Sequence, residues 1–412
     1  MKFSRALFFL TGFLGIFFLF KEIDREHLKT ENSDSMTASV FFTQSTPTAT
    51  LHSIFNDATK TGRKVNVLIV PGHEPDFGGA EYQNIKERDL NAELALDLVH
   101  YLAIDNHYNV ILARTRDEWN PDLQHYFATH DADIQSFIRD HKMEMAQLTD
   151  EGKLTKLASS TPHNDAPEDV AFRLFGTNKW ANENSINIIL HLHFNDSAPR
   201  PVNAPGEYNG FTLYVPEHQY SNSEASIGIA KNIFARLSKM FPVSNLPEEK
   251  NGVIEDQDLI ATGAANTVDA ASILIEYGYV YEPQFKIPSV RSLALNELAF
   301  RTYLGLSDFF GEKPIVANSY DSTLLPYEGT APVEKTKSAN KEVFAFQAAL
   351  IDRGLYPPKN FSANDCPLSG LFGSCTKAAL AEFQQKFNIT NETGFVGVKT
   401  RQQLKNLFKT SP

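Results

Sequence analysis

The chain has 412 residues, which is long enough for two or more domains of the usual ~100–200 residues. Lys and Arg number 38 against 50 Asp and Glu, and the resulting net charge of −12 argues against sequence-independent binding of nucleic acid, which needs a basic surface. There are only two cysteines, Cys366 and Cys375, so the composition also argues against a cysteine-ligated zinc site or an iron–sulfur cluster.

The N-terminal segment, residues 1–27, has the pattern of a targeting sequence. Lys2 and Arg5 precede an apolar run, residues 6–20, which has the length of a signal-peptide core and is shorter than the ~20 residues of a full membrane span. No small-residue cleavage site follows, so we favour an uncleaved anchor in the inner membrane over a cleaved signal. Either one exports the rest of the chain. Residues 28–62 are rich in Ser, Thr and Asn and predict a tether.

The first predicted domain covers residues 63–312 and opens with a buried strand. Val67 to Val70 are apolar, Pro71-Gly72 ends the strand, and His73 follows at its carboxyl end, where open α/β sheets place their ligands. A glycine-containing loop then leads to Glu87, which stands at the start of a helix whose leucines recur at a helical spacing.

Four further strands are predicted in this domain: 109–114, 186–195, 210–215 and 272–279. Helical patterns at 223–241 and 290–310 follow the later strands, so we expect a mostly parallel, twisted α/β sheet flanked by helices. Residues 118–170 predict an insertion over the edge of the sheet, with one or two helices. The insertion is either a lid over a site or surface ornament, and we favour ornament.

Four chemistry-bearing residues fall at the ends of these elements. Strand ends carry His73, His193 and Glu276, and a helix start carries Glu87. Two histidines and one carboxylate, with a fourth position left for water, form a catalytic zinc set, and a second carboxylate off the metal supplies a general base. The structural alternative requires four coincidences at element ends, so we infer a metal hydrolase.

The same motifs resemble those of the zinc-dependent N-acetylmuramoyl-L-alanine amidases of bacterial cell walls, over residues 64–311. The matching segments are Pro-Gly-His at 71–73, Glu-x-x-x-Asn at 87–91, Thr-Arg at 115–116, His-x-Asn at 193–195 and Glu-x-Gly at 276–278. The resemblance implies that His73, Glu87 and His193 bind Zn²⁺ and that Glu276 is the catalytic glutamate.

The sequence departs from the family pattern near these ligands. Val70 stands where Asp is common, Glu74-Pro75 where Gly-Gly is common, and His191 where Ser is common. The position of Asn195 favours His193 over His191 as the ligand. His191, Asn195 and Arg116 are candidates for supporting the ligands or contacting substrate, and His191 is also a competing ligand.

A second unit follows a linker predicted at residues 313–340. Residues 341–412 contain two copies of Gly-Φ-Φ-Gly followed by Thr and a helix, at 370–373 and 394–397. The pattern, with Phe383-Gln384, resembles the small three-helix, all-α peptidoglycan-binding domain of wall hydrolases. Cys366 and Cys375 flank the first copy and are candidates for a disulfide in an exported protein.

Together these features predict a monomeric, extracytoplasmic enzyme of the cell envelope with peptidoglycan as its partner. It would hydrolyse the amide bond between N-acetylmuramic acid and L-alanine. Two alternatives stay open from the sequence: a zinc peptidase that cuts within the stem peptide, and a non-catalytic wall-binding protein. The intact ligand set and Glu276 argue against the second, since binding alone does not require a base beside a metal.

Overall fold

The computed structural model describes residues 47–157, 166–316, 319–333 and 338–409. The predicted anchor at residues 1–27 and the tether as far as residue 46 lie outside these ranges. No helix within them is long and apolar enough to cross a membrane. The tether prediction was wrong for helix α3 (Thr48–Thr61), because Leu51, Ile54, Phe55 and Ala58 recur at a helical spacing and are buried in the core.

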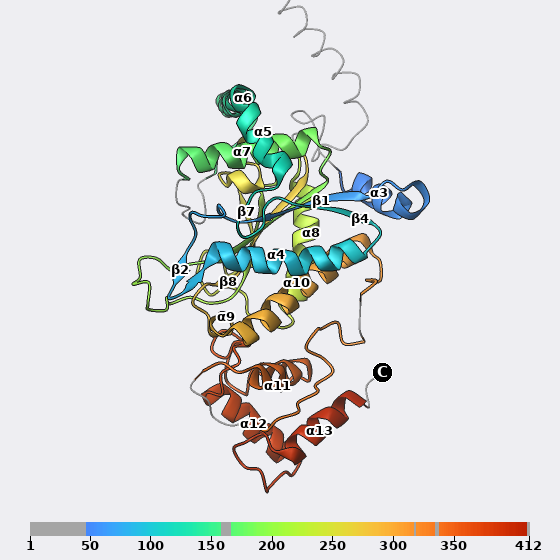
Figure 1. Ribbon diagram of the computed structural model, residues 1–412, viewed down its shortest axis with the longest axis vertical. Coiled ribbons are helices and arrows are strands. Elements are labelled where there is room, and N and C mark those ends of the chain that lie inside the picture. Colours follow the sequence, from blue (N-terminus) through green and yellow to red (C-terminus); the bar gives the residue numbers. More distant parts are fainter. Residues whose placement is uncertain (1–46, 158–165, 317–318, 334–337, 410–412) are drawn as a thin grey trace, which may run out of the picture.

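A six-stranded sheet forms the centre of the larger domain (Figure 1). Its order is β4-β1-β5-β8-β6-β7, made of β4 (Tyr108–Leu112), β1 (Val65–Pro71), β5 (Ile188–Asn195), β8 (Ala271–Tyr279), β6 (Thr212–Pro216) and β7 (Val253–Asp256). All neighbouring strands are parallel except β8 and β6. The predicted mostly parallel sheet is therefore confirmed. The short strand β7 is an addition to it, and β2 (Glu81–Tyr82) and β3 (Ile85–Lys86) form a separate two-stranded sheet.

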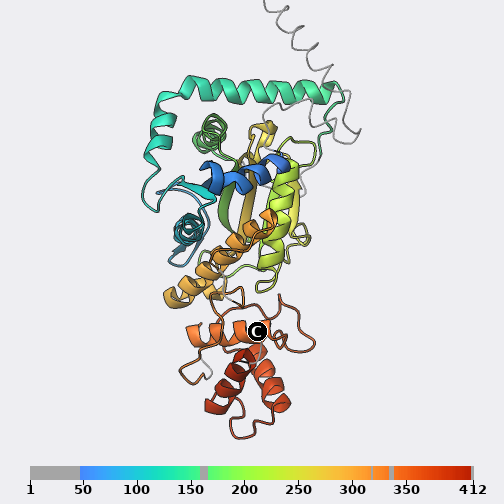
Figure 2. The ribbon, with the colours of Figure 1, turned by 90° about the vertical axis from the view of Figure 1, so that its right-hand side faces the viewer.

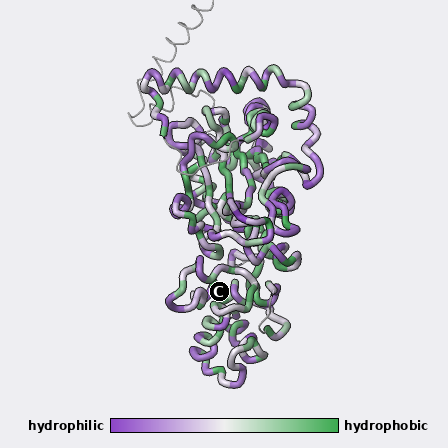
Figure 3. Tube along the Cα trace, turned by 90° about the vertical axis from the view of Figure 1, so that its left-hand side faces the viewer, coloured by the Kyte–Doolittle hydropathy of each residue, from purple (hydrophilic) through white to green (hydrophobic). Residues whose placement is uncertain are grey.

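Helices cover both faces of this sheet, as Figure 1 and Figure 2 show from two sides. One face carries α4 (Glu87–Ile104), α8 (Ser223–Leu237) and α10 (Pro288–Phe310), with the short α9 (Pro283–Lys286) between β8 and α10. The strand β1 shows why both faces are covered. Val67 and Ile69 belong to the core under α4, while Leu68 and Val70 belong to a second core on the opposite side. Figure 3 shows the hydrophobic residues concentrated along these central strands.

The predicted insertion supplies much of the second face. It contains α5 (Pro121–Thr129) and α6 (Asp131–Asp150), and α7 (Glu168–Glu183) begins at its end. Leu123, Tyr126 and Ile134 pack with Trp180 against the strand residues of the second core. The interpretation of the insertion as ornament was therefore wrong, because its apolar residues join α7 in the second core and are buried there. The long α6 is mostly exposed, and it extends across the end of the molecule in Figure 2. Residues 158–165 of the insertion lie outside the described ranges.

The C-terminal unit contains the three predicted helices, α11 (Lys341–Asp352), α12 (Ser374–Lys386) and α13 (Val398–Lys409), at the end of the molecule opposite α6 (Figure 1, Figure 2). Its internal repeat has a physical basis in two buried glutamines. Gln347 accepts hydrogen bonds from the backbone of Ser369 and Gly370 and donates to Leu371 and Thr376. Gln384 binds Gly394, Phe395 and Thr400 in the same way. Each Gly-Φ-Φ-Gly turn is therefore held by the helix that precedes it.

Part of the segment between the two units is packed against the protein, unlike an unstructured linker. Leu324, Leu325 and Tyr327 are buried, and Val333 forms an isolated bridge with Val396 of the C-terminal unit. The prediction of a linker over residues 313–340 missed these apolar anchors among its prolines and serines.

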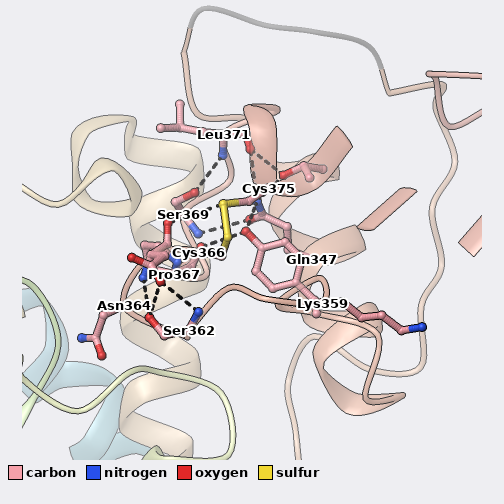
Figure 4. Close-up of a disulfide and its surroundings, with 12 residues drawn as sticks. Gln347, Lys359, Ser362, Asn364, Cys366, Pro367, Ser369, Leu371 and Cys375 are labelled. Atoms are coloured by element: carbon pink, nitrogen blue, oxygen red, sulfur yellow. Dashed lines mark hydrogen bonds between the residues drawn. A yellow bond between two sulfur atoms is a disulfide. The ribbon is translucent and has the colours of Figure 1, made fainter. Parts of the chain in front are cut away.

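Cys366 and Cys375 form a disulfide beside the first Gly-Φ-Φ-Gly turn, as Figure 4 shows. Near it, the side chain of Asn364 donates to Asn209 of the larger domain at 2.8 Å and joins the two units.

Candidate metal centre and its cleft

Three of the predicted residues converge on one point at the carboxyl ends of β1 and β5. Glu87 Oε1 lies 2.8 Å from His73 Nε2 and 3.1 Å from His193 Nδ1. His73 follows β1, His193 lies near the end of β5, and Glu87 opens α4. The ligand atoms of the three side chains lie within 4.8 Å of one another, which is the separation that one metal ion can bridge.

Two glycines make room for this convergence. A Cβ on Gly72 would lie 2.2 Å from the His193 ring, so no other residue fits between β1 and the imidazole without displacing it. Gly79 has a φ of +85°, and a Cβ there would meet His73 at 2.9 Å and Glu87 at 3.2 Å. The backbone is therefore shaped around the ligand side chains.

Glu87 is buried, with only 4% of its surface exposed. Its Oε2 accepts a hydrogen bond from the backbone of Ala80 at 2.8 Å, and its Oε1 accepts one from Phe194 at 3.3 Å. Burial alone would raise the pKa of Glu87, but the adjacent His73 and His193 hold it well below its ordinary value. The group is thus an anion at neutral pH, the form in which a carboxylate binds a cation.

The two histidines of β5 differ in their surroundings. Burial lowers the pKa of His193, and the contact with Glu87 opposes that shift. Burial and the neighbouring His193 lower the pKa of His191 to about 3, while a hydrogen bond with the backbone of Ala261 favours its protonated form. His191 Nε2 is buried and has no hydrogen-bond partner among the described residues. His191 is therefore a neutral imidazole that does not contact Glu87 as His193 does.

Glu276 is the neighbour of His193 in the sheet, because the two residues are paired in the parallel register of β5 and β8. Paired residues on adjacent strands point to the same face. Glu276 Oε2 is buried without a hydrogen-bond partner in the described part of the chain. Burial raises the pKa of Glu276 well above its ordinary value, and the charges of Glu87 and Glu249 add to the shift. An unpartnered carboxyl beside the ligands is suited to taking up a proton.

Arg114, which the sequence analysis did not single out, supports the loop at residues 72–79 that follows β1. This segment is called the metal loop below. Arg114 is 1% exposed and donates hydrogen bonds to the backbone oxygens of Pro71 at 3.0 Å and of Gly72. Asn91 donates to the same Gly72 oxygen at 3.2 Å. An arginine that ends a predicted buried strand was the available signal, because a buried charge needs partners.

Two further candidates from the sequence lie elsewhere. Arg116 pairs with Asp89 on the surface, and its side chain is 61% exposed, so the structure does not place it with the ligands. Asn195 donates to Glu249 Oε1 at 2.8 Å. Glu249, which the sequence analysis did not single out, is buried, and its charge raises the pKa of Glu276. Asn195 therefore acts on the site indirectly, through its hydrogen bond to Glu249.

A cavity of about 890 Å³ opens beside the ligands. His73, His191 and His193 lie along one side, with the metal loop around Phe77. The opposite side is formed by the start of α7 and by the segment that contains η1 (Ile260–Thr262), to which η2 (Ala264–Asn266) is joined. This volume is in the range of pockets that enclose a small ligand or a short peptide.

A second group with metal-binding side chains is formed by Glu217, His218 and Glu255. Two of these three residues are exposed, and His218 Nδ1 contacts the carboxylates of both Glu217 and Glu255. The group around Glu87 is therefore the stronger metal site.

Comparison with known families agrees with this geometry. Residues 67–286 match the N-acetylmuramoyl-L-alanine amidase family, and residues 339–404 match a peptidoglycan-binding domain. The first match covers more than half of the 412 residues, and the chain belongs to the N-acetylmuramoyl-L-alanine amidase family. It hydrolyses the amide that joins N-acetylmuramic acid to the peptide of peptidoglycan, and it acts outside the cytoplasm. The predicted family, fold class and activity are confirmed, and amidase rather than peptidase chemistry applies.

Several solved structures are similar to this chain at low identity. The N-acetylmuramyl-L-alanine amidase Ami1 from Mycobacterium smegmatis is 14% identical, over 60% of this chain and 97% of that chain, with a TM-score of 0.39. The CwlD amidase from Clostridioides difficile, solved in complex with the GerS lipoprotein, is 14% identical over 60% of this chain and 99% of that chain, with a TM-score of 0.39. The catalytic domain of CwlV from Bacillus (Paenibacillus) polymyxa var. colistinus is 15% identical over 60% and 99%, with a TM-score of 0.36. No curated protein matches the chain.

Proposed function

We propose that His73, Glu87 and His193 hold one zinc ion and that Glu276 is the general base of the hydrolysis. The observation that carries this proposal is the convergence of the three side chains beside Glu276, whose Oε2 is buried without a hydrogen-bond partner among the described residues. Two imidazoles and one carboxylate suit zinc and leave a coordination position for the reaction. Glu276 is not needed as a fourth ligand, since a closed set of four would exclude the reacting water.

Zinc, when bound, would polarise the scissile carbonyl and lower the pKa of the attacking water. Glu276 takes a proton from that water as its oxygen bonds to the carbonyl carbon of the lactyl group. The same carboxyl then delivers the proton to the nitrogen of L-alanine as the carbon–nitrogen bond breaks. The raised pKa of Glu276 suits both steps. It makes the carboxylate a stronger base toward the water, and the protonated carboxyl is then the acid that protonates the leaving nitrogen.

His191 has a different role in this scheme. Its Nε2 is unpartnered, and the residue lines the cleft together with His193. We assign it as a substrate contact: the neutral ring accepts a hydrogen bond from an amide N–H of the stem peptide. This would satisfy a buried polar atom that otherwise costs free energy.

Removal of the metal tests the proposed site directly. We expect one zinc per purified chain, loss of activity with a strong chelator, and recovery when zinc is returned. Sacculi digested by the holoenzyme should yield free stem peptides and peptide-free glycan, as mass spectrometry of the products would show. The double variant His218→Asn, Glu255→Gln is the matched control and should keep its zinc. Loss of zinc in that variant would move the metal to the other group.

We further infer that the C-terminal unit holds the enzyme on the wall and that the N-terminal segment contacts the inner membrane. The C-terminal unit carries exposed aromatic rings at Phe361 and Phe395, which are 45% and 37% exposed. Aromatic faces exposed to water are frequent anchors of binding surfaces. A deletion is a poor test, because Gly370 packs against Val290 of α10 and the deletion would expose that core.

The double variant Phe361→Ser, Phe395→Ser in the full chain is expected to weaken binding to insoluble sacculi by about tenfold, the scale of losing an interface anchor. Hydrolysis of soluble wall fragments should be unchanged, since neither ring lines the cleft. Ile315→Ser, which removes an exposed apolar residue outside the unit, is the control. Equal co-sedimentation of the variant and the wild type would show that these rings do not contact the wall.

A further inference from the structure

Glu74, next to the ligand His73, is a buried carboxylate with two partners from distant parts of the chain. It is 7% exposed. Its Oε1 accepts a hydrogen bond from Arg173 Nε at 2.8 Å, and its Oε2 accepts one from Trp119 Nε1 at 3.1 Å. Both oxygens are therefore engaged by side chains outside the metal loop.

The two partners stand at the two ends of the insertion. Trp119 lies at its beginning, directly before α5, and Arg173 lies just beyond its end, in the first turns of α7. About fifty residues, including α5 and α6, separate the two partners along the chain. A single carboxylate on the metal loop thus holds both ends of the insertion.

The metal loop has a backbone conformation that needs such support. His73 has a φ of +66°, in the left-handed region, which is disfavoured for a residue with a Cβ. Within the loop, Glu74 N donates to Phe77 O at 3.1 Å. The conformation sets the direction of the His73 side chain, so a shift at Glu74 would move a metal ligand.

We propose that Glu74 is a positioning residue, which fixes His73 through its bonds to Arg173 and Trp119 and thereby couples the insertion to the metal centre. The proposal rests on the assignment of His73 as a metal ligand. Glu74, Arg173 and Trp119 also lie along the cleft, so the same bonds fix the distance between its two walls.

The ion pair is well placed to act in this way. Glu74 is buried. Arg173 has a second carboxylate partner, Asp169, at 2.9 Å, and the side chain of Asp169 is 67% exposed. Although burial opposes it, hydrogen bonding to Glu74 and Asp169 raises the pKa of Arg173. An exposed pair contributes little to stability, whereas loss of one partner from a buried pair is costly. Asp169 therefore supplies a matched control on the same arginine.

The experiment compares Glu74→Ala with Asp169→Asn in the full chain, using zinc affinity from chelator competition and amide hydrogen exchange of the metal-free protein. We expect Glu74→Ala to weaken zinc binding by about 10–100-fold, as for other residues that orient a ligand. Exchange should rise at residues 73–79 while the central strands stay protected. Asp169→Asn should change neither measurement by more than about twofold, and Glu74→Gln, which keeps an acceptor, should fall between them.

Unchanged affinity and unchanged exchange in a folded Glu74→Ala variant would overturn the proposal. If that variant does not fold, Trp119→Phe and Arg173→Met remove one bond each, and wild-type affinity in both would overturn it equally. If the wild type binds no zinc, the proposed metal centre is what fails. The exchange measurement then still decides whether Glu74 holds the loop, because it uses metal-free protein.

Discussion

Replacement of His193 with alanine is expected to remove zinc from the enzyme and to abolish hydrolysis. The imidazole contacts Glu87 at 3.1 Å and fills the space that Gly72 leaves open, and no other side chain in the described ranges completes the group. Two remaining ligands would bind zinc weakly, since structural and catalytic sites use at least three protein ligands. Metal analysis after gel filtration measures the loss directly.

His191→Ala is the matched control, two residues away on the same face of β5. It should keep about one zinc per chain, because His191 is not one of the three side chains that converge on the proposed metal position. Its Michaelis constant should rise if the ring contacts substrate. Retention of zinc in His193→Ala together with loss in His191→Ala would exchange the roles of the two histidines.

The candidate residues that the sequence singled out and that the fold brings together share one physical property. His73, His193 and Glu276 stand at the ends of hydrophobic runs, and parallel strands bring such ends to one edge of a sheet. Glu87 opens a helix in which the buried Leu90, Leu94 and Leu98 recur at a helical spacing. Local patterns of this kind can be read without knowing which distant segments meet.

The supporting residues could not be predicted in the same way, because their roles depend on contacts far apart in the sequence. Glu74 gains its partners from positions 119 and 173, and Arg114 reaches back to the carbonyls of the β1 loop. Their residue types are ordinary in surface loops. Only the fold shows that they are buried and paired.

The insertion and α3 show a second limit of sequence reasoning. A polar composition predicted a surface addition and a tether, yet Leu123 and Tyr126 complete one core and Leu51 and Phe55 belong to the other. A few apolar residues at helical spacing outweigh many polar neighbours, because only the buried face of a helix determines whether it packs.

Glu276→Gln is expected to lower turnover by about 10²–10⁴-fold, which is the usual contribution of a general base. The substitution keeps the size of the side chain and a hydrogen-bonding tip but removes the proton acceptor. Zinc content should be unchanged, because Glu276 is not among the three converging ligands. Zinc, melting temperature and turnover should be measured on one preparation.

The melting temperature adds a test that does not depend on activity. Burial and the charges of Glu87 and Glu249 raise the folded-state pKa of Glu276 above its ordinary value of 4.5. Its contribution to stability is therefore present below that value and is lost as the pH rises toward the folded-state pKa. Glutamine carries no such penalty, so the metal-free variant should melt higher than the metal-free wild type at neutral pH, and the difference should shrink in acid.

If zinc is lost together with activity, Glu276 is a ligand. If turnover stays near wild type with zinc bound, the base lies elsewhere and His191 becomes the first candidate, since it is buried, lines the cavity and has an Nε2 without a hydrogen-bond partner among the described residues.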